Sequence, residues 1–489
     1  MSIPLQDPSL LKTKAYVNGQ WIDADSGKTF PVYNPATGEK IADVPRLGRA
    51  ETRRAIEAAD KAWAGWKSKL AKERAVILRR FFDLMMANQK DLATIMTVEQ
   101  GKPLAESMGE IVYGASFVEW FGEEAKRVYG DTIPEHRGDA RLMVRKEPIG
   151  VTAGITPWNF PSSMITRKAM PALAAGCPMV VKPSEDTPLS ALALAEIAER
   201  AGIPAGVFSI VTGAREDAAE IGEELSTNPI VRKIGFTGST PVGKILMRNA
   251  SATVKKISLE LGGNAPLIVF DDADIDLAVN GTMAGKFRNA GQVCVAPNRI
   301  LVQDGVFDRY VDRLAARVQQ LKVGNGLEEG VTLGPLINER GFEKVQRHID
   351  QATGAGAKVM VGGHAHNLGG SFFQPTVMTG IDTDMDMTQE ETFGPVAALM
   401  RFKSEEDALR IANDTPYGLA AYFFSQDIGR CFRVAEQLES GMVGINNGLI
   451  STEVAPFGGV KESGLGREGS HYGIEEWMEI KYYSFGAIQ

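Results

Sequence analysis

The sequence predicts an α/β protein with two domains, each built on a mostly parallel sheet. Three observations carry this prediction. Short apolar runs alternate with helical stretches from about residue 148, the alternation starts afresh after Gly262, and a mostly helical arm precedes both. Strands separated by helices at this spacing are typical of parallel βαβ units. The length of 489 residues agrees, because a chain of this size is expected to form two or three domains.

The first domain is predicted to span residues 1–130 and 148–261. Gly176 and Gly202 each follow a helical stretch, and glycine is the usual residue just past a helix end because it adopts positive φ without strain. Apolar periodicity predicts helices over 50–66, 72–88, 91–97, 164–175 and 189–201, and apolar runs predict strands over 148–156, 178–182, 207–211 and 231–236.

The second domain is predicted to span residues 262–455, where the same alternation resumes. We expect helices over 275–288 and 306–321, and strands over 266–270, 299–302, 358–361, 396–402, 420–424 and 442–445.

Residues 131–147 and 470–489 fit neither domain. Their stretches RLMVRKEP and EIKYYSFGA resemble exposed strands, and exposed strands commonly pair with another chain. These two segments are therefore predicted to form extended ribbons through which the chain assembles with a partner chain.

The composition excludes several partners and sites. Lys and Arg number 53 and Asp and Glu 61, so the net charge of −8 argues against nucleic acid and anionic membranes as partners. No apolar stretch is long enough to span a membrane, and the N-terminus does not resemble a signal peptide. Three cysteines without a C-x-x-C pair indicate a reducing compartment, so we expect the cytoplasm. The histidines form no metal-binding motif, and no metal site is expected.

Two glycine-rich stretches resemble nucleotide-binding loops but depart from them. Residues 464–469 match G-x-G-x-x-G, yet no apolar strand precedes them, so we interpret them as a plain loop. Residues 238–245 nearly match a P-loop, but Ile245 replaces the Mg²⁺-binding hydroxyl and Pro241 lacks a backbone donor. Gly238 still follows a strand and opens a helix, whose N-terminus can face a phosphate. The alternative is an ordinary strand-to-helix turn.

Cys294 is the first candidate for chemistry. It ends the stretch FRNAGQVC (287–294), between a predicted helix and a predicted strand, where Asn, Gly and Pro297 indicate a turn. A cysteine thiolate is a strong nucleophile when its surroundings lower its pKa. The alternative is a structural buried cysteine, which is our interpretation of Cys177 and Cys431.

Glu260 is the second candidate. It ends a strand-like run in LELGGN (259–264), between two leucines. A carboxylate in apolar company has a raised pKa, which suits a general base. The alternative is a strand-end glutamate with ordinary partners.

Asn159 is the third candidate, in the stretch TPWNFP (156–161) after a predicted strand. Ligand sites of α/β sheets lie at such strand ends, and a rigidly held amide can donate to a developing oxyanion. The alternative is a turn asparagine that bonds its own backbone.

Together these stretches resemble the aldehyde dehydrogenase superfamily over essentially the whole chain. The matching motifs are TPWNFP (156–161), KPSEDTP (182–188), GFTGSTPVG (235–243), LELGGNAP (259–266), FRNAGQVC (287–294), EETFGP (390–395) and PFGG (456–459). The resemblance implies two Rossmann-like domains, an NAD(P)-binding domain at 1–130 and 148–261 and a catalytic domain at 262–455, plus an oligomerisation ribbon.

The resemblance also implies a role for each candidate. Cys294 attacks the aldehyde as a thiolate, and the Asn159 amide with the Cys294 backbone N–H holds the oxyanion. Hydride transfer to the nicotinamide leaves a thioester, which water activated by Glu260 hydrolyses to the carboxylic acid. Relatives that pass the acyl group to CoA lack this glutamate, so Glu260 favours hydrolysis.

The implied cofactor is NAD, with NADP as the alternative. A carboxylate near the ribose 2′ position repels a 2′-phosphate, so Glu185 favours NAD, whereas Lys182 and Ser184 are compatible with NADP. The residues that match the family's cofactor positions are Thr156, Pro157, Trp158, Lys182, Ser184, Glu185, Gly238, Ser239, Glu391 and Phe393.

Within the superfamily the sequence resembles succinate-semialdehyde dehydrogenases, through stretches such as YGDTIP (129–134) and GREGSHYGIEEWMEIKY (466–482). The resemblance implies that Arg167, Arg288 and Ser451 hold the distal carboxylate of a small anionic aldehyde. The alternative for either arginine is a structural salt bridge.

One departure leaves the aldehyde open. Many members of that subfamily have a second cysteine two residues after the nucleophile, but Ala296 stands there in this chain. Succinate semialdehyde is the first expectation, with glutarate semialdehyde, 2-oxoglutarate semialdehyde and sulfolactaldehyde as alternatives. A broad-specificity aldehyde dehydrogenase and a non-catalytic protein on the same fold are the remaining alternatives.

Overall fold

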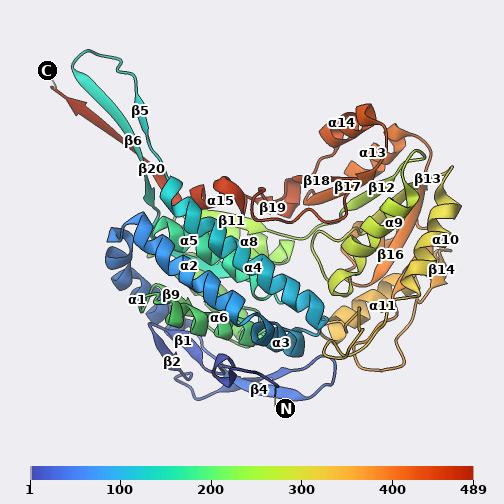
Figure 1. The fold of residues 1–489 in the computed structure, drawn as a ribbon, viewed down its shortest axis with the longest axis horizontal. Helices are drawn as coiled ribbons and strands as arrows, with labels where there is room; N and C mark the ends of the chain where they lie inside the picture. The colour runs from blue at the N-terminus through green and yellow to red at the C-terminus, as the bar shows by residue number, and fades with distance from the viewer. Residues whose placement is uncertain (1–2, 488–489) are drawn as a thin grey trace.

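The computed structural model describes residues 3–487, so residues 1–2 and 488–489 of the predicted segments lie outside it. Two lobes lie side by side, and a ribbon projects from one of them (Figure 1). Among the described residues, no helix is long and apolar enough to cross a membrane.

The first lobe contains an eight-stranded sheet whose five central strands are parallel. An Asn18–Gly19 hairpin extends one edge in antiparallel fashion, and a short return strand near the C-terminus closes the other. In spatial order the strands are β19 (Gly464–Leu465), β11 (Lys256–Glu260), β10 (Val231–Thr237), β7 (Val151–Ile155), β8 (Met179–Lys182), β9 (Phe208–Ile210), β1 (Ala15–Val17) and β2 (Gln20–Ile22).

Helices cover both faces of this sheet because each face is apolar. One large core packs five helices on one face, and a smaller core packs the first and seventh helices on the other. The helices are α1 (Arg49–Ser68), α2 (Ala71–Ala87), α3 (Gln89–Gln100), α4 (Leu104–Glu124), α5 (Ser163–Ala175), α6 (Pro188–Ala201), α7 (Ala218–Thr227) and α8 (Thr240–Ser251). A separate hairpin of β3 (Thr29–Tyr33) and β4 (Lys40–Pro45) lies near the N-terminus.

The second lobe contains a seven-stranded sheet that is parallel except for its first edge strand. Its strands in spatial order are β14 (Lys358–Val361), β15 (Thr376–Thr379), β16 (Val396–Phe402), β13 (Arg299–Gln303), β12 (Pro266–Val269), β17 (Ala420–Phe424) and β18 (Met442–Ile445). Its helices are α9 (Ile275–Thr282), α10 (Phe307–Val318), α11 (Glu339–Gly354), α12 (Asp386–Gln389), α13 (Glu405–Asn413) and α14 (Ile428–Gln437). The α/β prediction is confirmed for both lobes.

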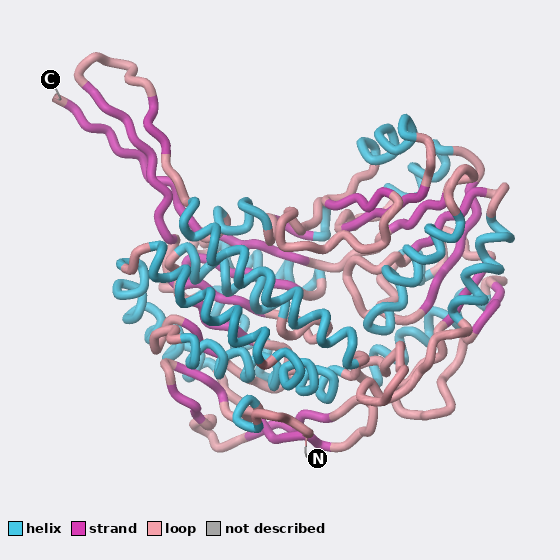
Figure 2. Tube along the Cα trace, in the orientation of Figure 1, coloured by secondary structure: helices cyan, strands magenta, loops and turns pink. Residues whose placement is uncertain are grey.

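The ribbon is a three-stranded antiparallel sheet that extends far from the body (Figure 2). Its strands are β20 (Met478–Gly486), β6 (Ala140–Pro148) and β5 (Asp131–Ile133). The two predicted ribbon segments thus pair with each other. Residues 470–475 differ from the prediction, since they form helix α15 (Ser470–Glu475), which packs against α4 and α5.

Two predicted elements are corrected by the structure. The expected strand over 148–156 is divided at Gly150, whose φ of 133° ends β6 and lets β7 begin in another sheet. The expected helix over 275–288 ends at Thr282 and continues as a π-helix, Met283–Phe287. A single-turn π segment keeps nearly helical periodicity, so the sequence pattern does not reveal it, and such segments are frequent at functional sites.

Candidate active site

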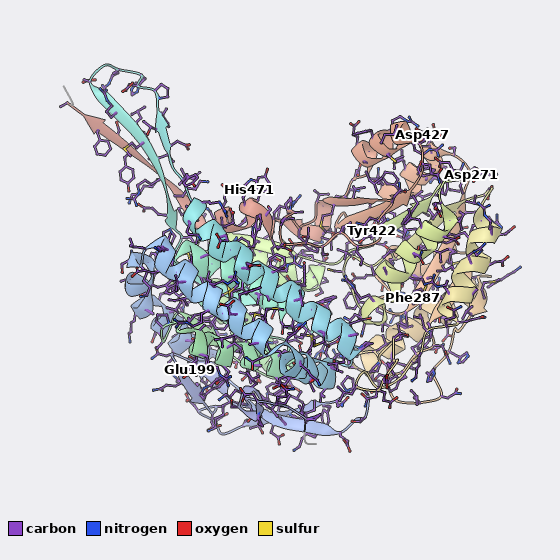
Figure 3. All side chains as sticks on the ribbon, viewed as in Figure 1. Glu199, Asp271, Phe287, Tyr422, Asp427 and His471 are labelled. Atoms are coloured by element: carbon purple, nitrogen blue, oxygen red, sulfur yellow. The ribbon has the colours of Figure 1, made fainter. Side chains whose placement is uncertain are left out.

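Cys294 follows a strained turn between the π-helix and β13. Asn289 and Ala290 have φ values of 50° and 53°, and Gly291 follows with 73°. Each non-glycine residue in this conformation costs about 1 kcal/mol, so the surroundings must hold the turn in place. Part of that support comes from Glu106, whose carboxylate accepts the backbone N–H of Asn289 at 2.7 Å. Beyond the nucleophile, the hydroxyl of Tyr422 on β17, labelled in Figure 3, donates to the carbonyl of Val295 at 2.8 Å.

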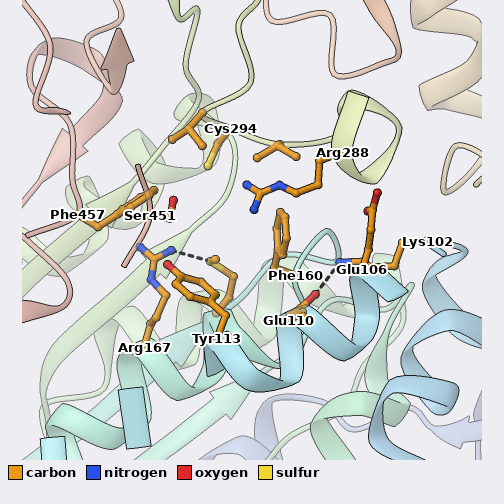
Figure 4. Close-up of a pocket in the computed structure, with 14 residues that line it drawn as sticks. Lys102, Glu106, Glu110, Tyr113, Phe160, Arg167, Arg288, Cys294, Ser451 and Phe457 are labelled. Atoms are coloured by element: carbon orange, nitrogen blue, oxygen red, sulfur yellow. Dashed lines mark hydrogen bonds and ion pairs between the residues drawn. The ribbon is translucent and has the colours of Figure 1, made fainter. Parts of the chain in front are cut away.

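Two cavities meet at Cys294. The smaller cavity, about 250 Å³, is lined by Cys294 together with both predicted anchor arginines, Arg167 and Arg288 (Figure 4). The larger cavity, about 500 Å³, is lined by Cys294, Asn159 and Glu260. Because the thiol lies where the two join, a molecule in each cavity can reach it from a different side.

Asn159 sits just beyond the C-terminal end of β7 and is buried. Its Nδ2 donates to the carbonyl of Gln292 at 3.0 Å, which fixes the side chain and leaves the second N–H free to donate elsewhere. Its own backbone carbonyl accepts a bond from the buried ammonium of Lys102 at 2.7 Å. The backbone N–H of Cys294 makes no hydrogen bond to another described residue. These two donors have the chemistry of an oxyanion site.

Glu260 ends β11, and its side chain is buried, with one carboxylate oxygen lacking a hydrogen-bond partner among the described residues. Burial, reinforced by the negative charge of Glu468, raises the pKa of Glu260 well above its ordinary value. Arg167 lowers it again, by less. A carboxylate with a raised pKa beside a reactive thiol has the properties of a general base.

Burial also raises the pKa of Cys294, to about 12. The negative charge of Glu391 raises it further, whereas Arg167 and Arg288 lower it. In the structure as it stands the thiol is therefore protonated at neutral pH, and formation of the thiolate requires a base to accept its proton.

The two predicted anchor arginines have different surroundings. Arg167 on α5 is buried, stacks on the ring of Phe457 at 3.9 Å and forms an ion pair with Glu468 at 2.7 Å. Arg288 forms no ion pair with any described carboxylate and lies 5.3 Å from the ring of Phe160. Ser451 and Tyr113 line the same cavity. The cavity therefore offers one unpaired guanidinium, that of Arg288, whereas the charges of Arg167 and Lys102 are each partly neutralised by a carboxylate.

The larger cavity has the features of a dinucleotide site. Helix α8 begins at its wall, and its N-cap Ser239 makes no side-chain capping bond, so the first N–H groups of the helix are available to a phosphate. Phe393, at φ 56°, packs edge-on against Trp158 at 5.5 Å. The predicted cofactor residues that line this cavity are Pro157, Trp158, Ser184, Glu185, Gly238, Ser239, Glu391 and Phe393.

Thr156 and Lys182 lie behind the wall of this cavity. The backbone N–H of Thr156 bonds the carbonyl of Lys182 at 3.1 Å, between neighbouring strands. The Lys182 amine donates to the carbonyl of Pro183 and lies 3.6 Å from the carboxylate of Glu185. The positive charge of Lys182 is therefore partly neutralised by Glu185.

Several buried polar residues of the site were not found by sequence reasoning. Glu468 bonds the amine of Lys168 at 2.6 Å, and Lys102 bonds Glu110 at 2.6 Å. Glu468 lies in the GREGSHYG stretch (466–473), which indicates the subfamily. Nothing in that stretch predicts its contact with Lys168, 300 residues earlier in the chain.

Among residues 3–487, no group of three or more His, Cys, Asp or Glu side chains is arranged to hold a metal ion.

Comparisons with known proteins agree with this geometry. The chain is 63% identical to a glutarate-semialdehyde dehydrogenase of Pseudomonas aeruginosa, covering 99% of this chain and 100% of the relative. It is 60% identical to a 3-sulfolactaldehyde dehydrogenase of Pseudomonas putida and 59% identical to an NADP-dependent succinate-semialdehyde dehydrogenase of Escherichia coli, with 99% of each chain covered in both cases.

Solved structures match equally closely. A crystal structure of an E. coli NADP-dependent enzyme has a TM-score of 0.98 at 59% identity and covers 99% of this chain and 100% of its own. Betaine aldehyde dehydrogenase of Staphylococcus aureus in complex with NAD⁺ has a TM-score of 0.95 at 37% identity, covering 98% of this chain and 95% of its own. The aldehyde dehydrogenase family matches residues 21–483. The chain therefore belongs to the aldehyde dehydrogenase family, whose members use NAD or NADP.

Proposed function

We propose that this chain oxidises a small anionic aldehyde to the carboxylic acid, with succinate semialdehyde as the first substrate and NAD as the preferred cofactor. The observation that carries the proposal is the meeting of two cavities at Cys294, one holding Arg167 and Arg288 and the other having the features of a dinucleotide site. Water supplies the second oxygen atom of the new carboxyl group.

The Cys294 thiol passes its proton to solvent water, and the thiolate attacks the aldehyde carbon, forming a carbon–sulfur bond. The resulting oxyanion accepts hydrogen bonds from the Asn159 amide and from the Cys294 backbone N–H. A nicotinamide held beside Trp158 and Phe393 would supply the acceptor for the hydride of this carbon, and loss of that hydride would leave a thioester on Cys294. Glu260 takes a proton from water, the hydroxide adds to the thioester, and the thiolate departs as the acid forms.

The distal anion is recognised by the arginines of the smaller cavity. Arg288 meets it with an unpaired guanidinium, and Arg167 shares its charge between the substrate and Glu468. Glutarate semialdehyde is the second candidate, favoured by the 63% identity to the P. aeruginosa glutarate-semialdehyde dehydrogenase. A cavity of about 250 Å³ admits either chain length.

The preference for NAD follows from Glu185. The Glu185 carboxylate lines the larger cavity and lies 3.6 Å from the Lys182 amine. A 2′-phosphate at this point would be repelled by that carboxylate, and the Lys182 amine would already be paired with it. The ribose hydroxyls of NAD can instead donate to that carboxylate.

We also propose the division of labour within the chain. Residues 1–130 and 148–261 bind the cofactor, residues 262–455 carry the nucleophile, and the ribbon strands β5, β6 and β20 join copies into a homodimer or homotetramer. Exposed apolar side chains along the ribbon, such as Ile480 and Tyr482, support assembly through this element. Free cysteines support a cytoplasmic location.

The proposal is tested by following reduced-nicotinamide formation with succinate semialdehyde, glutarate semialdehyde and propanal, each with NAD and with NADP. We expect kcat/KM for an anionic aldehyde to exceed that for propanal by about 100-fold, since a hydrogen bond to a charged group contributes roughly 1.5–3 kcal/mol. Cys294→Ser should abolish turnover, and Glu260→Gln should give one burst of reduced cofactor and then stop. Equal rates with propanal contradict the anionic substrate.

A further inference from the structure

The buried amide of Asn289 joins the Asn159 turn to the loop that carries Cys294. Its Nδ2 donates to the backbone carbonyl of Asn159 at 3.0 Å and to that of Gln292 at 3.3 Å. The Gln292 carbonyl also accepts the side-chain Nδ2 of Asn159, at 3.0 Å. One amide nitrogen thus bridges the proposed oxyanion donor and the backbone two positions before the nucleophile.

The orientation of the Asn289 amide is fixed from every side. Gln100, at the end of α3, donates to its Oδ1 at 3.0 Å, which assigns the other amide atom as the donor. The Asn289 backbone N–H donates to Glu106 at 2.7 Å, and its carbonyl accepts from both the backbone and the side chain of Gln292. With 1% of its surface exposed, this side chain has no alternative partner in water.

Asn289 also has a left-handed backbone, at φ 50° and ψ 37°. Asparagine tolerates this conformation better than most residues, so its presence has two separate explanations. Either the backbone requires a residue that accepts positive φ, or the side chain is needed as the bridge. The two explanations predict different effects for glycine and alanine at this position.

We propose that Asn289 is a positioning residue for oxyanion stabilisation, acting through Asn159. This inference rests on the proposed function. One N–H of Asn159 is held by Gln292, so the direction of its free N–H depends on how the Asn159 turn lies against the cysteine loop. Among the described residues, the Asn289 side chain bonds both backbones at once, and the Lys102 amine also donates to the Asn159 carbonyl.

The test compares Asn289→Gly with Asn289→Ala. Glycine removes the bridge but accepts positive φ, whereas alanine removes the bridge and adds strain. We expect kcat/KM for the best aldehyde to fall by about 10- to 100-fold in both variants, because a displaced oxyanion donor loses much of its effect. Alkylation of Cys294 by iodoacetamide should stay within about threefold of wild type, since this displacement needs no oxyanion donor.

Asn18 provides a matched control. It has φ 52° in the exposed β1–β2 hairpin, remote from both cavities, so Asn18→Gly and Asn18→Ala report the backbone effect alone. We expect both Asn18 variants to keep wild-type kcat/KM.

Each outcome decides the inference. Wild-type kcat/KM in Asn289→Gly with a loss only in Asn289→Ala overturns it, because the backbone alone then explains the asparagine. If Asn289→Gly does not fold, Gln100→Met removes the donor that orients the amide, and unchanged kcat/KM in that variant overturns the inference as well. A folded wild-type protein that oxidises no aldehyde contradicts the proposed function instead.

Discussion

The guanidinium of Arg167 lies 2.7 Å from the carboxylate of Glu468, within the wall of the cavity that holds Cys294. The same carboxylate bonds Lys168 at 2.6 Å, and its charge raises the pKa of Glu260. The residue proposed to bind the distal end of the substrate is therefore connected, through one carboxylate, to the residue proposed to activate water.

The first prediction separates the two arginines. Arg288→Met should raise KM for the anionic aldehyde by about 100-fold with little change in melting temperature, since an unpaired cation is lost. Arg167→Met should lower the melting temperature markedly as well, because it leaves Glu468 with one cation fewer in a buried site, and breaking such a pair costs about 3–5 kcal/mol. Steady-state kinetics and thermal unfolding measure both effects. Equal unfolding temperatures for the two variants contradict the assignment.

The site was predictable from the sequence where function follows from local position. Glu260 ends a parallel strand, Asn159 follows one, and Cys294 lies in a helix-to-strand connection, so the strand pattern and a few flanking glycines and prolines indicated all three positions. Glu468 was not predictable in this way, because its partner Lys168 lies 300 residues earlier and no periodicity links them.

The same limit applies to the finer fold. Both sheets were predicted from apolar runs. The π-helix before Arg288 keeps an ordinary helical sequence pattern, so the sequence does not reveal it. The turn that follows it, with positive φ at Asn289 and Ala290, is visible only in the structure. The short strands β1 and β19 contribute three and two residues to the first sheet, too few for an alternating pattern to indicate them.

A second prediction concerns Glu468. Glu468→Gln removes a negative charge that raises the pKa of Glu260, so the pKa of Glu260 should fall. Glu260 acts as a base when deprotonated, and the acidic limb of the thioester-hydrolysis rate should therefore move to lower pH. The measurement is the pH profile of kcat under conditions where hydrolysis limits turnover. A limb that stays in place or moves upward shows that Glu468 does not act on Glu260.

A third prediction concerns cofactor choice. Glu185→Gln removes the carboxylate that lies 3.6 Å from the Lys182 amine, which frees that amine for a 2′-phosphate. The KM for NADP should fall by about tenfold, as expected for one Lys–phosphate contact near a protein surface, and the KM for NAD should rise. The double variant Glu185→Gln/Lys182→Met should lose the gain with NADP. A gain that survives in the double variant assigns the effect to another residue.

A fourth prediction concerns the acidity of the nucleophile. Burial raises the pKa of Cys294 to about 12. Below that pH, each increase of one pH unit raises the thiolate fraction about tenfold. Iodoacetamide alkylation of Cys294 in the enzyme without cofactor should accelerate with this slope from about pH 6 to pH 9 and reach no plateau. Arg288→Met should slow the alkylation relative to wild type at every pH. The Arg288 guanidinium lowers the pKa of the thiol, so its removal leaves less thiolate. Cys294→Ser corrects for alkylation of Cys177 and Cys431. A plateau near neutral pH would contradict this prediction, because it would mean that the free enzyme already holds a thiolate.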